Sequence, residues 1–463
     1  MKILLTNSFI QANHRHVHIH PNFGDLALLQ LSEMISDFNE ILILDNLVER
    51  SFFQLRKFLK AIESFKPDVI GISNNCIGDM LPILKLVKVI RKRFPKIIIV
   101  GGGINATVYW EHFLKNGFDF VVLGEGEFTF RELILALNLT GKCFDDIMGL
   151  TFKRDNVLFK TEPRQLIKDL DDLPIIKNRK PLKSKLFPGR WSVSLETSRG
   201  CPYGCNFCSP SAFWEKTYRR KSNTRILEEI KMLYDCWGPL HIYFTDITMT
   251  HDKEKVIELL KMILSAQIDI KWFAESRADV FADNPRLVEL AKESGMYATL
   301  LGFETFDQKL MNTLGKNIVV SKNIEAYHAL KRNNIFVIGS HMFGIPGQTK
   351  QNFKTTYSLG VKYTDIFWIS YFAAIPGTPL FRKYELLNSS NKIELESLLK
   401  LKSYKNLCQY AFILIRYYSS FKVFLKLIVP RSRIHFKLQL LSYTAFISTI
   451  YYKLLTMAYI KKI

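Results

Sequence analysis

The sequence predicts an α/β protein with two domains and a basic, helical C-terminal region. Strand-like apolar runs alternate with helical patterns over residues 1–140, and six further strand-and-helix units follow within residues 191–385. The length of 463 residues is too great for one ordinary hydrophobic core. A chain with 48% hydrophobic and 23% charged residues has the composition of a globular protein.

Residues 1–140 are predicted to form a doubly wound, parallel, Rossmann-like sheet. Apolar runs of strand length are separated by longer helical patterns, and this alternation places helices on both faces of a parallel sheet. The ligand-binding loops of such sheets lie at the carboxyl ends of the strands. The predicted strands are residues 2–6, 40–44, 69–73, 97–100 and 120–123.

Three loops at these strand ends are candidate ligand sites. The loop after the fourth strand is a run of three glycines, which lacks the G-x-G-x-x-G spacing of a dinucleotide site. A glycine run lets the backbone come close to a large flat ligand, although it could also be only a turn. The candidate binding residues are Ser73, Gly101, Gly102, Gly103, Gly124 and Glu125.

Two other segments of this half carry weaker signals. Residues 141–190 are predicted to be a connector, because short polar and Pro-containing pieces dominate there. Residues 14–20 place four histidines at alternating positions, which could hold a metal if the stretch were extended. Such a run is more often a solvated loop, so both interpretations stay open.

Residues 191–385 are predicted to form a parallel barrel. Six strand-like runs recur there, each followed by a helical pattern or a loop, and repeated units of this kind place their chemistry at the carboxyl ends of the strands. The predicted strands are residues 191–195, 241–244, 271–274, 298–303, 336–342 and 366–371.

Polar residues at the ends of these strands are candidate site residues. Each one also has a structural alternative, such as a salt bridge or a helix cap. Charged side chains seldom lie at barrel strand ends without a purpose, which favours a functional role for the group. The candidates are Asp246, Glu275, Ser276, Arg277 and Glu304.

The loop after the first barrel strand carries three cysteines at C-x₃-C-x₂-C spacing, Cys201, Cys205 and Cys208. Three thiolates this close can hold a metal centre and leave one coordination position open. A structural zinc site would need a fourth ligand, and no residue with suitable spacing follows. Seven cysteines in 463 residues, without a secretory signal, favour a reducing, cytoplasmic location over a disulfide framework.

This loop, with Arg199-Gly200 before it and Phe207 before its last cysteine, resembles the cluster loop of the radical SAM enzymes. The resemblance implies a partial (β/α)₆ barrel of the TIM type and a [4Fe–4S] cluster held by the three cysteines. S-adenosylmethionine (SAM) would bind the fourth iron. By the same resemblance, Phe207 lies against the adenine of SAM. The other residues expected to contact SAM are Asp246, Glu275, Ser276, Arg277 and Glu304. Relatives have a second carboxylate directly after Asp246, where this chain has Ile247.

The first domain has its own resemblance. Residues 66–73, 99–103 and 119–127 together are similar to the cobalamin-binding domain that precedes many radical SAM cores. The D-x-H-x-x-G motif that supplies a histidine to cobalt elsewhere is absent, so cobalamin is expected without a protein histidine on its metal. The first loop, residues 14–24, departs from the Pro- and Gly-rich loops of relatives.

These resemblances imply an enzyme that cleaves SAM to methionine and a 5′-deoxyadenosyl radical. With cobalamin, it would methylate an unactivated carbon of a small-molecule or lipid substrate, and it would need an electron donor such as flavodoxin or ferredoxin. Two alternatives stay open. One is a radical SAM cyclase, rearrangement enzyme or oxidoreductase without methyl transfer. The other is a non-catalytic membrane- or partner-binding protein with a relic cluster.

The C-terminal region, residues 386–463, carries much of the net charge of +21. After Glu396 it holds twelve Lys and Arg, thirteen Tyr and Phe, and no acidic residue. This pattern suits the boundary of an anionic membrane. A helical cap on the barrel with a basic outer face is an equal alternative, and nucleic acid ranks below both. No transmembrane helix is predicted, since the longest uncharged run is shorter than the roughly 20 residues required.

Overall fold

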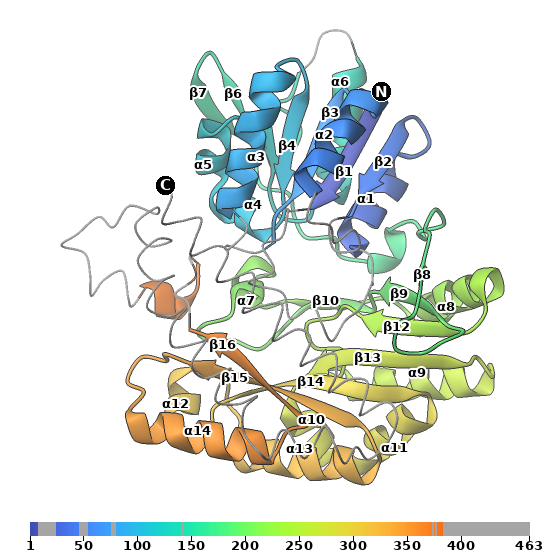
Figure 1. The fold of residues 1–463 in the computed structure, drawn as a ribbon, viewed down its shortest axis with the longest axis vertical. Helices are drawn as coiled ribbons and strands as arrows, with labels where there is room; N and C mark the ends of the chain where they lie inside the picture. The colour runs from blue at the N-terminus through green and yellow to red at the C-terminus, as the bar shows by residue number, and fades with distance from the viewer. Residues whose placement is uncertain are drawn as a thin grey trace. The chain divides into compact units, whose positions relative to one another are not determined.

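The computed structural model describes residues 1–7, 25–45, 54–75, 80–139, 143–372, 375 and 377–382. These residues form two compact units, the first ending at Pro181 and the second beginning at Leu182 (Figure 1). The histidine run at 14–20 and the basic region at 386–463 lie outside the described residues. None of the described helices is long and apolar enough to cross a membrane.

The first unit contains the predicted doubly wound sheet. Five strands are parallel in the order β2-β1-β3-β4-β5, and two antiparallel strands, β6 and β7, extend the sheet beyond β5. The carboxyl ends of the parallel strands therefore share one edge. The strands are β1 (Lys2–Asn7), β2 (Glu40–Leu44), β3 (Val69–Ser73), β4 (Ile98–Gly102), β5 (Phe120–Val122), β6 (Leu150–Arg154) and β7 (Val157–Lys160).

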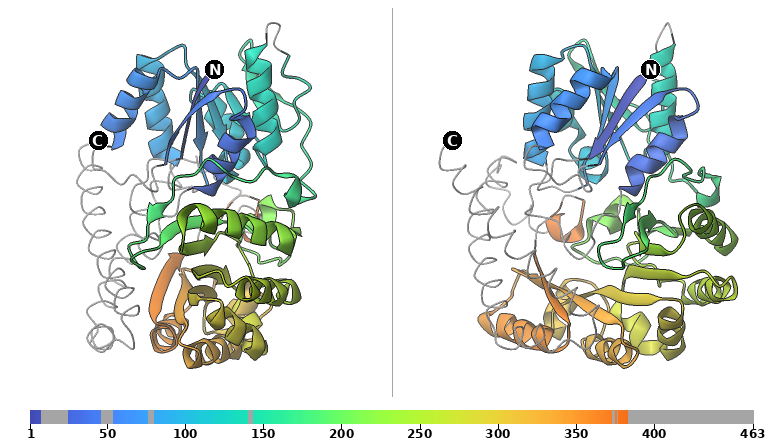
Figure 2. Two further views of the ribbon diagram at one scale, coloured as in Figure 1. Left: turned by 90° about the vertical axis from the view of Figure 1, so that its right-hand side faces the viewer. Right: turned by 45° about the vertical axis from the view of Figure 1, so that its right-hand side comes forward.

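Helices cover both faces of this sheet, with the blue α2 and α3 on one side and the teal α6 on the other (Figure 2). Buried side chains of α1 and α6 share a core with Ile3, Leu5, Val69 and Val100 of the strands. Consecutive residues of β1, β3, β4 and β5 are buried, which is the pattern of parallel strands covered by helices on both faces. The helices are α1 (Leu26–Ile35), α2 (Gln54–Phe65), α3 (Met80–Arg93), α4 (Ile104–Val108), α5 (Trp110–Lys115) and α6 (Glu127–Asn138).

Part of the predicted connector is strand. β6 pairs with β5, and its Leu150 and Phe152 side chains are buried in the core of the first unit. A two-residue turn, Asp155 and Asn156, joins β6 to β7, and both turn residues have positive φ angles, 48° and 64°. Asp and Asn tolerate this left-handed conformation, which two-residue hairpin turns require. The turn was the sequence signal for a hairpin in residues 141–190.

The second unit is an open, partial barrel. Six parallel strands, β9 and β12 to β16, follow one another across the sheet, and the short β8 pairs antiparallel with β9 at one edge. Within the described residues β16 does not pair with β8, so the sheet is not closed. The strands are β8 (Leu182–Lys183), β9 (Trp191–Leu195), β12 (Leu240–Phe244), β13 (Ile270–Ser276), β14 (Met296–Glu304), β15 (Phe336–Phe343) and β16 (Ile366–Tyr371).

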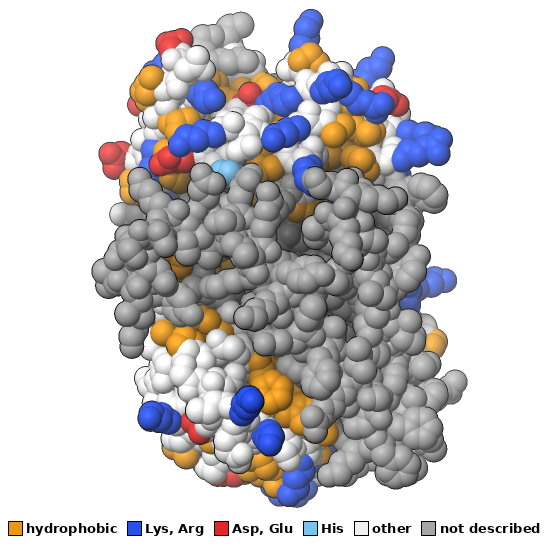
Figure 3. Space-filling model, turned by 60° about the vertical axis from the view of Figure 1, so that its left-hand side comes forward, with side chains coloured by type: hydrophobic (Ala, Val, Ile, Leu, Met, Phe, Trp, Pro, Cys, Tyr) orange, Lys and Arg blue, Asp and Glu red, His pale blue; other side chains and the backbone are white. Residues whose placement is uncertain are grey.

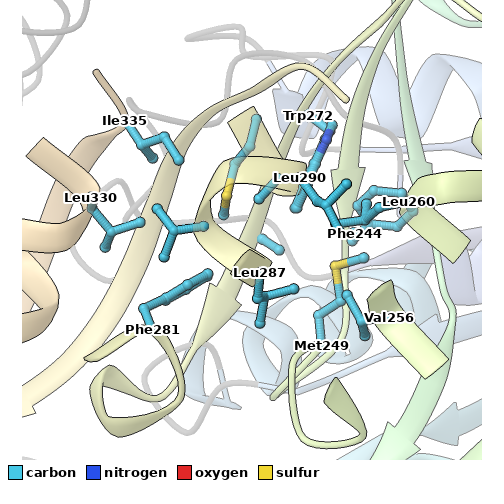
Figure 4. Packing of buried hydrophobic residues seen from close by; sticks show 14 of the residues in the cluster. Phe244, Met249, Val256, Leu260, Trp272, Phe281, Leu287, Leu290, Leu330 and Ile335 are labelled. Atoms are coloured by element: carbon cyan, nitrogen blue, oxygen red, sulfur yellow. The ribbon is translucent and has the colours of Figure 1, made fainter. Parts of the chain in front are cut away.

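The helices of the second unit pack on the outer face of this sheet. Figure 4 shows Phe244 and Trp272 of β12 and β13 beside Leu290 of a helix, in a cluster that also includes Leu287 and Leu330. The helices are α8 (Asn223–Trp237), α9 (Lys253–Ser265), α10 (Ala278–Asp283), α11 (Pro285–Glu293), α12 (Gln308–Thr313), α13 (Ser321–Arg332) and α14 (Lys350–Lys362).

A second cluster fills the inner face of the sheet at the amino ends of its strands. Phe187 and Phe273 pack there with Tyr297 and Phe336. Because this end is filled with large side chains, ligands of the barrel have to bind at the carboxyl ends.

Positive charges are dispersed on one face of the first unit (Figure 3). On the face in Figure 3, Lys and Arg side chains of this unit are interspersed with apolar and acidic ones. A dispersed arrangement differs from the continuous basic stripe that is the footprint of a nucleic-acid site.

A small hairpin leads into the cysteine loop of the second unit. β10 (Ser198–Gly200) pairs antiparallel with β11 (Tyr218–Arg220), and the loop with the short α7 (Ser209–Phe213) lies between them. Gly200 has a φ of +87°, and a Cβ at this position would lie 2.2 Å from the Thr217 carbonyl oxygen. Only glycine therefore fits at the start of the loop.

We expect Gly200→Ala to destabilise the second unit by more than about 2 kcal/mol, because the new Cβ meets backbone in a left-handed conformation. Gly204→Ala is the matched control in the same loop. A Cβ there would lie 3.4 Å from the flexible end of the Lys216 side chain, without an unusual φ. Urea unfolding of both variants measures the difference, and equal stability of the two would contradict this account of Gly200.

Candidate functional site

The three predicted cysteines lie together on one loop. Cys201 directly follows β10, and both Cys201 and Cys205 are buried, while Cys208 is half-buried. The backbone N–H of Cys208 donates to the Cys205 carbonyl at 3.2 Å, which closes a tight turn between them. All three side chains are cysteine thiols outside any described disulfide. The loop therefore presents three soft sulfur donors from a short, folded segment.

The side chain and backbone of Asn206 attach this loop to the segment after α12. The Asn206 backbone N–H donates to the Leu314 carbonyl at 2.8 Å, and its side-chain Nδ2 donates to the Thr313 carbonyl at 3.1 Å. A Cβ at Gly315 would lie 2.7 Å from Nδ2 of Asn206, so glycine is needed for the close approach. The Asn206 carbonyl accepts from the Leu380 N–H at 3.0 Å. We call residues 313–316 the clamp segment.

Arg277, at the end of β13, connects the clamp segment to the cysteine loop. Its guanidinium lies 3.8 Å from the centre of the Tyr203 ring, and its Nη1 donates to the Lys316 carbonyl at 3.1 Å. Its Nη2 also forms an ion pair with Asp279 at 2.8 Å. The predicted SAM contact Arg277 is thus placed beside the cysteines by partners on three different segments.

Lys316 and Glu304 form a buried ion pair beside the same loop. The Lys316 ammonium lies 2.7 Å from Glu304 Oε1 and donates to the Gly302 carbonyl at 2.5 Å. Both side chains are less than 10% exposed. Glu304 has a φ of +56°, and the register of β14 against β15 shifts at this point. Strained backbone of this kind persists where surrounding contacts hold it, and it concentrates at functional sites.

Sequence reasoning identified Glu304 but missed Lys316. A single lysine after a glycine in a loop is normally solvent-exposed, so no local pattern predicts its burial. Asn206 and Tyr203 were missed as well, since their roles depend on contacts with residues far away in the sequence. The one indirect signal was a carboxylate at a predicted strand end, Glu304, because a carboxylate that becomes buried there needs a cation nearby.

Burial raises the pKa values of the Cys201 and Cys205 thiols. The positive charges of Arg277 and Lys316 oppose this effect at both sulfurs, and the Glu304 carboxylate adds to it at Cys205. Because a metal binds the thiolate form, the two cations favour metal binding while burial disfavours an uncompensated charge. The two cations therefore suit a negatively charged metal centre held by the thiolates.

The donor set fits an iron–sulfur cluster better than a single ion. Within the described residues, no three His, Cys, Asp or Glu side chains converge as ligands of one metal ion. In a four-iron cluster each thiolate holds its own iron, so three sulfurs on one loop need not meet at a point. The three thiols also leave the fourth iron of such a cluster without a protein ligand from this loop.

Asp246 supports the loop from behind. Its Oδ1 accepts from the Thr197 hydroxyl at 2.7 Å and from the Ser198 hydroxyl, and its Oδ2 accepts from the Thr197 N–H at 3.1 Å. Burial raises the pKa of this carboxyl, and these hydrogen bonds counteract the shift. The contacts seen for Asp246 hold the chain that enters β10. We therefore assign it a positioning role, and the predicted cofactor contact stays untested.

Glu275 and Ser276 end β13 and have separate partners. The Tyr243 hydroxyl donates to Glu275 Oε1 at 2.9 Å, and the Thr250 hydroxyl donates to the Ser276 hydroxyl at 3.1 Å. Burial raises the pKa of Glu275. Hydrogen bonds in the described part of the chain use only Oε1 of Glu275. Its other oxygen can accept a hydrogen bond from a ligand.

Phe207 packs against an apolar cluster that includes Leu310, Leu314, Met342 and Ile345. These residues come from α12, the segment after it, and the end of β15. The predicted contact of Phe207 with adenine stays a prediction.

The candidate residues of the first unit lie where predicted, at the carboxyl ends of β3, β4 and β5. Gly102 and Gly124 border open space, because a Cβ at either position would meet no atom of the described residues within 4 Å. Gly101 differs, since a Cβ there would lie 3.1 Å from the Phe118 ring, and Gly103 has a φ of +95°. Gly102 and Gly124 thus fit the approach of a large ligand, whereas Gly101 is tightly packed against a ring and the fold requires glycine at Gly103.

Ser73 and Glu125 have structural partners. The Asn75 side-chain amide donates to the Ser73 hydroxyl at 3.3 Å. The Glu125 carboxylate accepts from the Ile167 N–H at 2.6 Å and so holds the segment that follows β7. Ser73 is partly exposed at the strand edge, while Glu125 is buried. A ligand contact is therefore easier for Ser73 than for Glu125.

Two family descriptions match the chain. Residues 17–134 match the B12 binding domain, and residues 195–360 match the radical SAM superfamily. The first match covers the sheet edge with Gly102 and Gly124, and the second covers the cysteine loop and strands β12 to β15.

Similar proteins include several with named activities. An uncharacterized methyltransferase of Pyrococcus horikoshii is 31% identical over 371 residues, which are 79% of this chain and 79% of that protein. An anaerobic magnesium-protoporphyrin IX monomethyl ester cyclase of Synechocystis is 29% identical over 59% of this chain and 55% of that protein. The hopanoid C-3 methylase of Methylococcus capsulatus is 26% identical over 71% of this chain. This chain spans 61% of the hopanoid enzyme's length.

A solved structure shares the fold. The cobalamin-dependent SAM radical enzyme OxsB, with aqua-cobalamin and SAM bound, superimposes with a TM-score of 0.68. The superposition covers 98% of this chain and 72% of that one, at 17% sequence identity. Identity this low supports a common fold and nothing finer. The two domain matches and the Pyrococcus relative show that the chain belongs to the radical SAM enzymes that carry a B12 binding domain.

Proposed function

We propose that this protein cleaves SAM with a [4Fe–4S] cluster held by Cys201, Cys205 and Cys208. The observation that carries the proposal is the arrangement of three cysteine thiols on a loop fixed by Asn206 and flanked by Arg277 and Lys316. When bound and reduced, the cluster supplies one electron, which breaks a carbon–sulfur bond of SAM to give methionine and a 5′-deoxyadenosyl radical.

The side chains around the loop have distinct roles in this proposal. The cysteines hold three irons, and the buried cations of Arg277 and Lys316 offset the negative charge of the thiolates. Glu275 offers a free carboxylate oxygen to the amino or hydroxyl groups of SAM. Asp246 and the clamp segment keep the loop in place. Because large side chains fill the amino end of the barrel, ligands can enter only at the carboxyl ends of the strands.

We further propose that the first unit binds cobalamin, which supplies a methyl group for transfer to an unactivated carbon of a small-molecule or lipid substrate. The open space at Gly102 and Gly124 supports this assignment, and so do the names of the Pyrococcus and Methylococcus relatives. Radical chemistry without methyl transfer is the second candidate, favoured by the similarity to the cyclase of Synechocystis. Methyl transfer from isotopically labelled SAM separates the two.

The partners and location stay proposals. A reduced cluster requires an electron donor such as flavodoxin or ferredoxin, and the small number of cysteines fits a cytoplasmic enzyme. The basic and aromatic composition after Glu396 supports association with an anionic membrane surface.

We expect Cys205→Ala to abolish SAM cleavage, because the cluster would lose one of its three protein ligands. The matched control is Cys236→Ala, which removes an exposed thiol on α8. Both proteins are reconstituted with iron and sulfide under anaerobic conditions and reduced, and 5′-deoxyadenosine is quantified by chromatography. Cleavage by Cys205→Ala at the rate of the control would remove the central claim.

We expect Gly102→Phe to weaken cobalamin binding at least tenfold, because the ring would occupy the open space beside β4. The substitution should fold normally, since a Cβ at Gly102 meets no neighbour in the described part of the chain. Leu139→Phe, at an exposed site just beyond α6, is the control. Absorbance titration with hydroxocobalamin measures both affinities. If the wild-type protein takes up iron but no cobalamin, the methyl-transfer proposal is wrong.

We expect truncation after Glu396 to release the protein from anionic vesicles, because the region removed carries twelve cationic residues and no acidic ones. Each cation contributes on the order of 1 kcal/mol near such a surface, so binding of the full chain should weaken at high salt. Vesicle co-sedimentation measures both effects. If the full-length protein does not co-sediment with anionic vesicles, the membrane proposal is wrong. An insoluble truncated chain would favour the barrel-cap alternative.

A further inference from the structure

Asn74 is a buried amide without partners at the carboxyl end of β3. Its side chain is 0% exposed, and neither Oδ1 nor Nδ2 has a hydrogen-bond partner within the described part of the chain. Among the residues that the structure describes, no other Asn or Gln side chain has both polar atoms buried and unpaired. A buried donor and a buried acceptor that stay unpaired are costly to the folded chain, and such groups need an explanation.

The backbone around Asn74 is firmly held. Its N–H donates to the Gly102 carbonyl at 2.8 Å, and its carbonyl accepts from the Asn105 N–H at 3.1 Å. A Cβ at Gly103 would lie 2.7 Å from the Asn74 carbonyl oxygen, so this approach requires glycine. The unmet hydrogen bonds of the side chain are therefore not the result of a loosely placed loop.

The neighbouring amides show that partners are available nearby. Asn75, the next residue, uses both polar atoms, since Oδ1 accepts from the Ile104 N–H at 3.0 Å and Nδ2 donates to Ser73. Asn105 is also buried, and its Nδ2 lacks a partner. Unpaired amide groups thus gather at the ends of β3 and β4, next to the open space at Gly102.

We propose that the Asn74 side chain pairs with a carboxamide on the corrin ring of cobalamin. This inference rests on the proposed cobalamin binding by the first unit. A primary carboxamide offers one acceptor and one donor at a spacing that matches Oδ1 and Nδ2, and the rim of the corrin ring carries several such groups. A phosphate or carboxylate would satisfy Nδ2 and leave Oδ1 unpaired.

The covered position of Asn74 adds a second consequence. Ligand binding has to uncover the amide and then supply its partners. The unpaired amide consequently destabilises the cobalamin-free protein, and the paired amide stabilises the cobalamin-bound protein. An apolar residue of similar size, as in Asn74→Leu, should therefore leave the cobalamin-free protein at least as stable as wild type while it weakens binding. A purely structural asparagine would show the opposite pattern of stability.

The experiment uses the full chain with its iron site reconstituted. Hydroxocobalamin and cobinamide, which keeps the ring carboxamides but lacks the nucleotide, are titrated by absorbance into wild type, Asn74→Leu and Asn74→Ala. We expect each substitution to lower the affinity for each of the two ligands about tenfold or more. The melting temperature of cobalamin-free Asn74→Leu should equal or exceed that of wild type.

Gln30→Leu is the matched control, because Gln30 is a buried amide of the same unit whose Nε2 donates to the Pro174 carbonyl at 3.1 Å. It should melt at a lower temperature than wild type and bind cobalamin with wild-type affinity. Wild-type affinity of both Asn74 variants overturns the inference, as does weakening for cobalamin but not for cobinamide. A lower melting temperature of Asn74→Leu also overturns it. If wild type itself binds no cobalamin, the proposed function fails rather than this assignment alone.

Discussion

The contact between Asn206 and the clamp segment is the constraint on which the candidate site depends. Two hydrogen bonds from Asn206 to the Thr313 and Leu314 carbonyls place the cysteine loop against the end of α12. Gly315 permits this close approach. The next residue, Lys316, forms an ion pair with Glu304, and its backbone carbonyl accepts a hydrogen bond from Arg277. One short segment thus brings together the thiols, two buried cations and a carboxylate from separate strands. A direct contact between the Arg277 guanidinium and the Tyr203 ring also ties the cysteine loop to the end of β13.

Burying these charges is costly, and the structure offsets the cost locally. Lys316 and Glu304 pair with each other, while the Asp246 carboxylate receives hydrogen bonds from Thr197 and Ser198. Buried ion pairs of this kind contribute little net stability compared with apolar residues, so their presence is better explained by the electrostatics of the site. A cluster with three thiolates carries negative charge, and the nearby cations favour it in a region of low dielectric constant.

The alternation of apolar runs was sufficient to predict both sheets, since each predicted strand is present and the order of β1 to β5 is that of a doubly wound fold. The hairpin of β6 and β7 was missed because its Asp155-Asn156 turn is short and its strands lie within a polar stretch. The cysteines and the strand-end residues could be selected from spacing and position. Lys316, Asn206 and Asn74 could not, because burial and missing partners arise only when distant segments pack together. For the same reason the sequence could not show that Asp246 and Glu125 have structural partners. Their contacts are mainly with protein backbone and hydroxyl groups.

The central claim is that a cluster on these three cysteines has an iron that SAM can bind. Electron paramagnetic resonance of the reduced, reconstituted protein tests this most directly, with spectra recorded before and after SAM is added. The account predicts a cluster signal that depends on the three cysteines and whose g-values change with SAM, because the ligand would bind the fourth iron. A cluster signal that SAM leaves unchanged, in protein shown to bind iron in full, would contradict it.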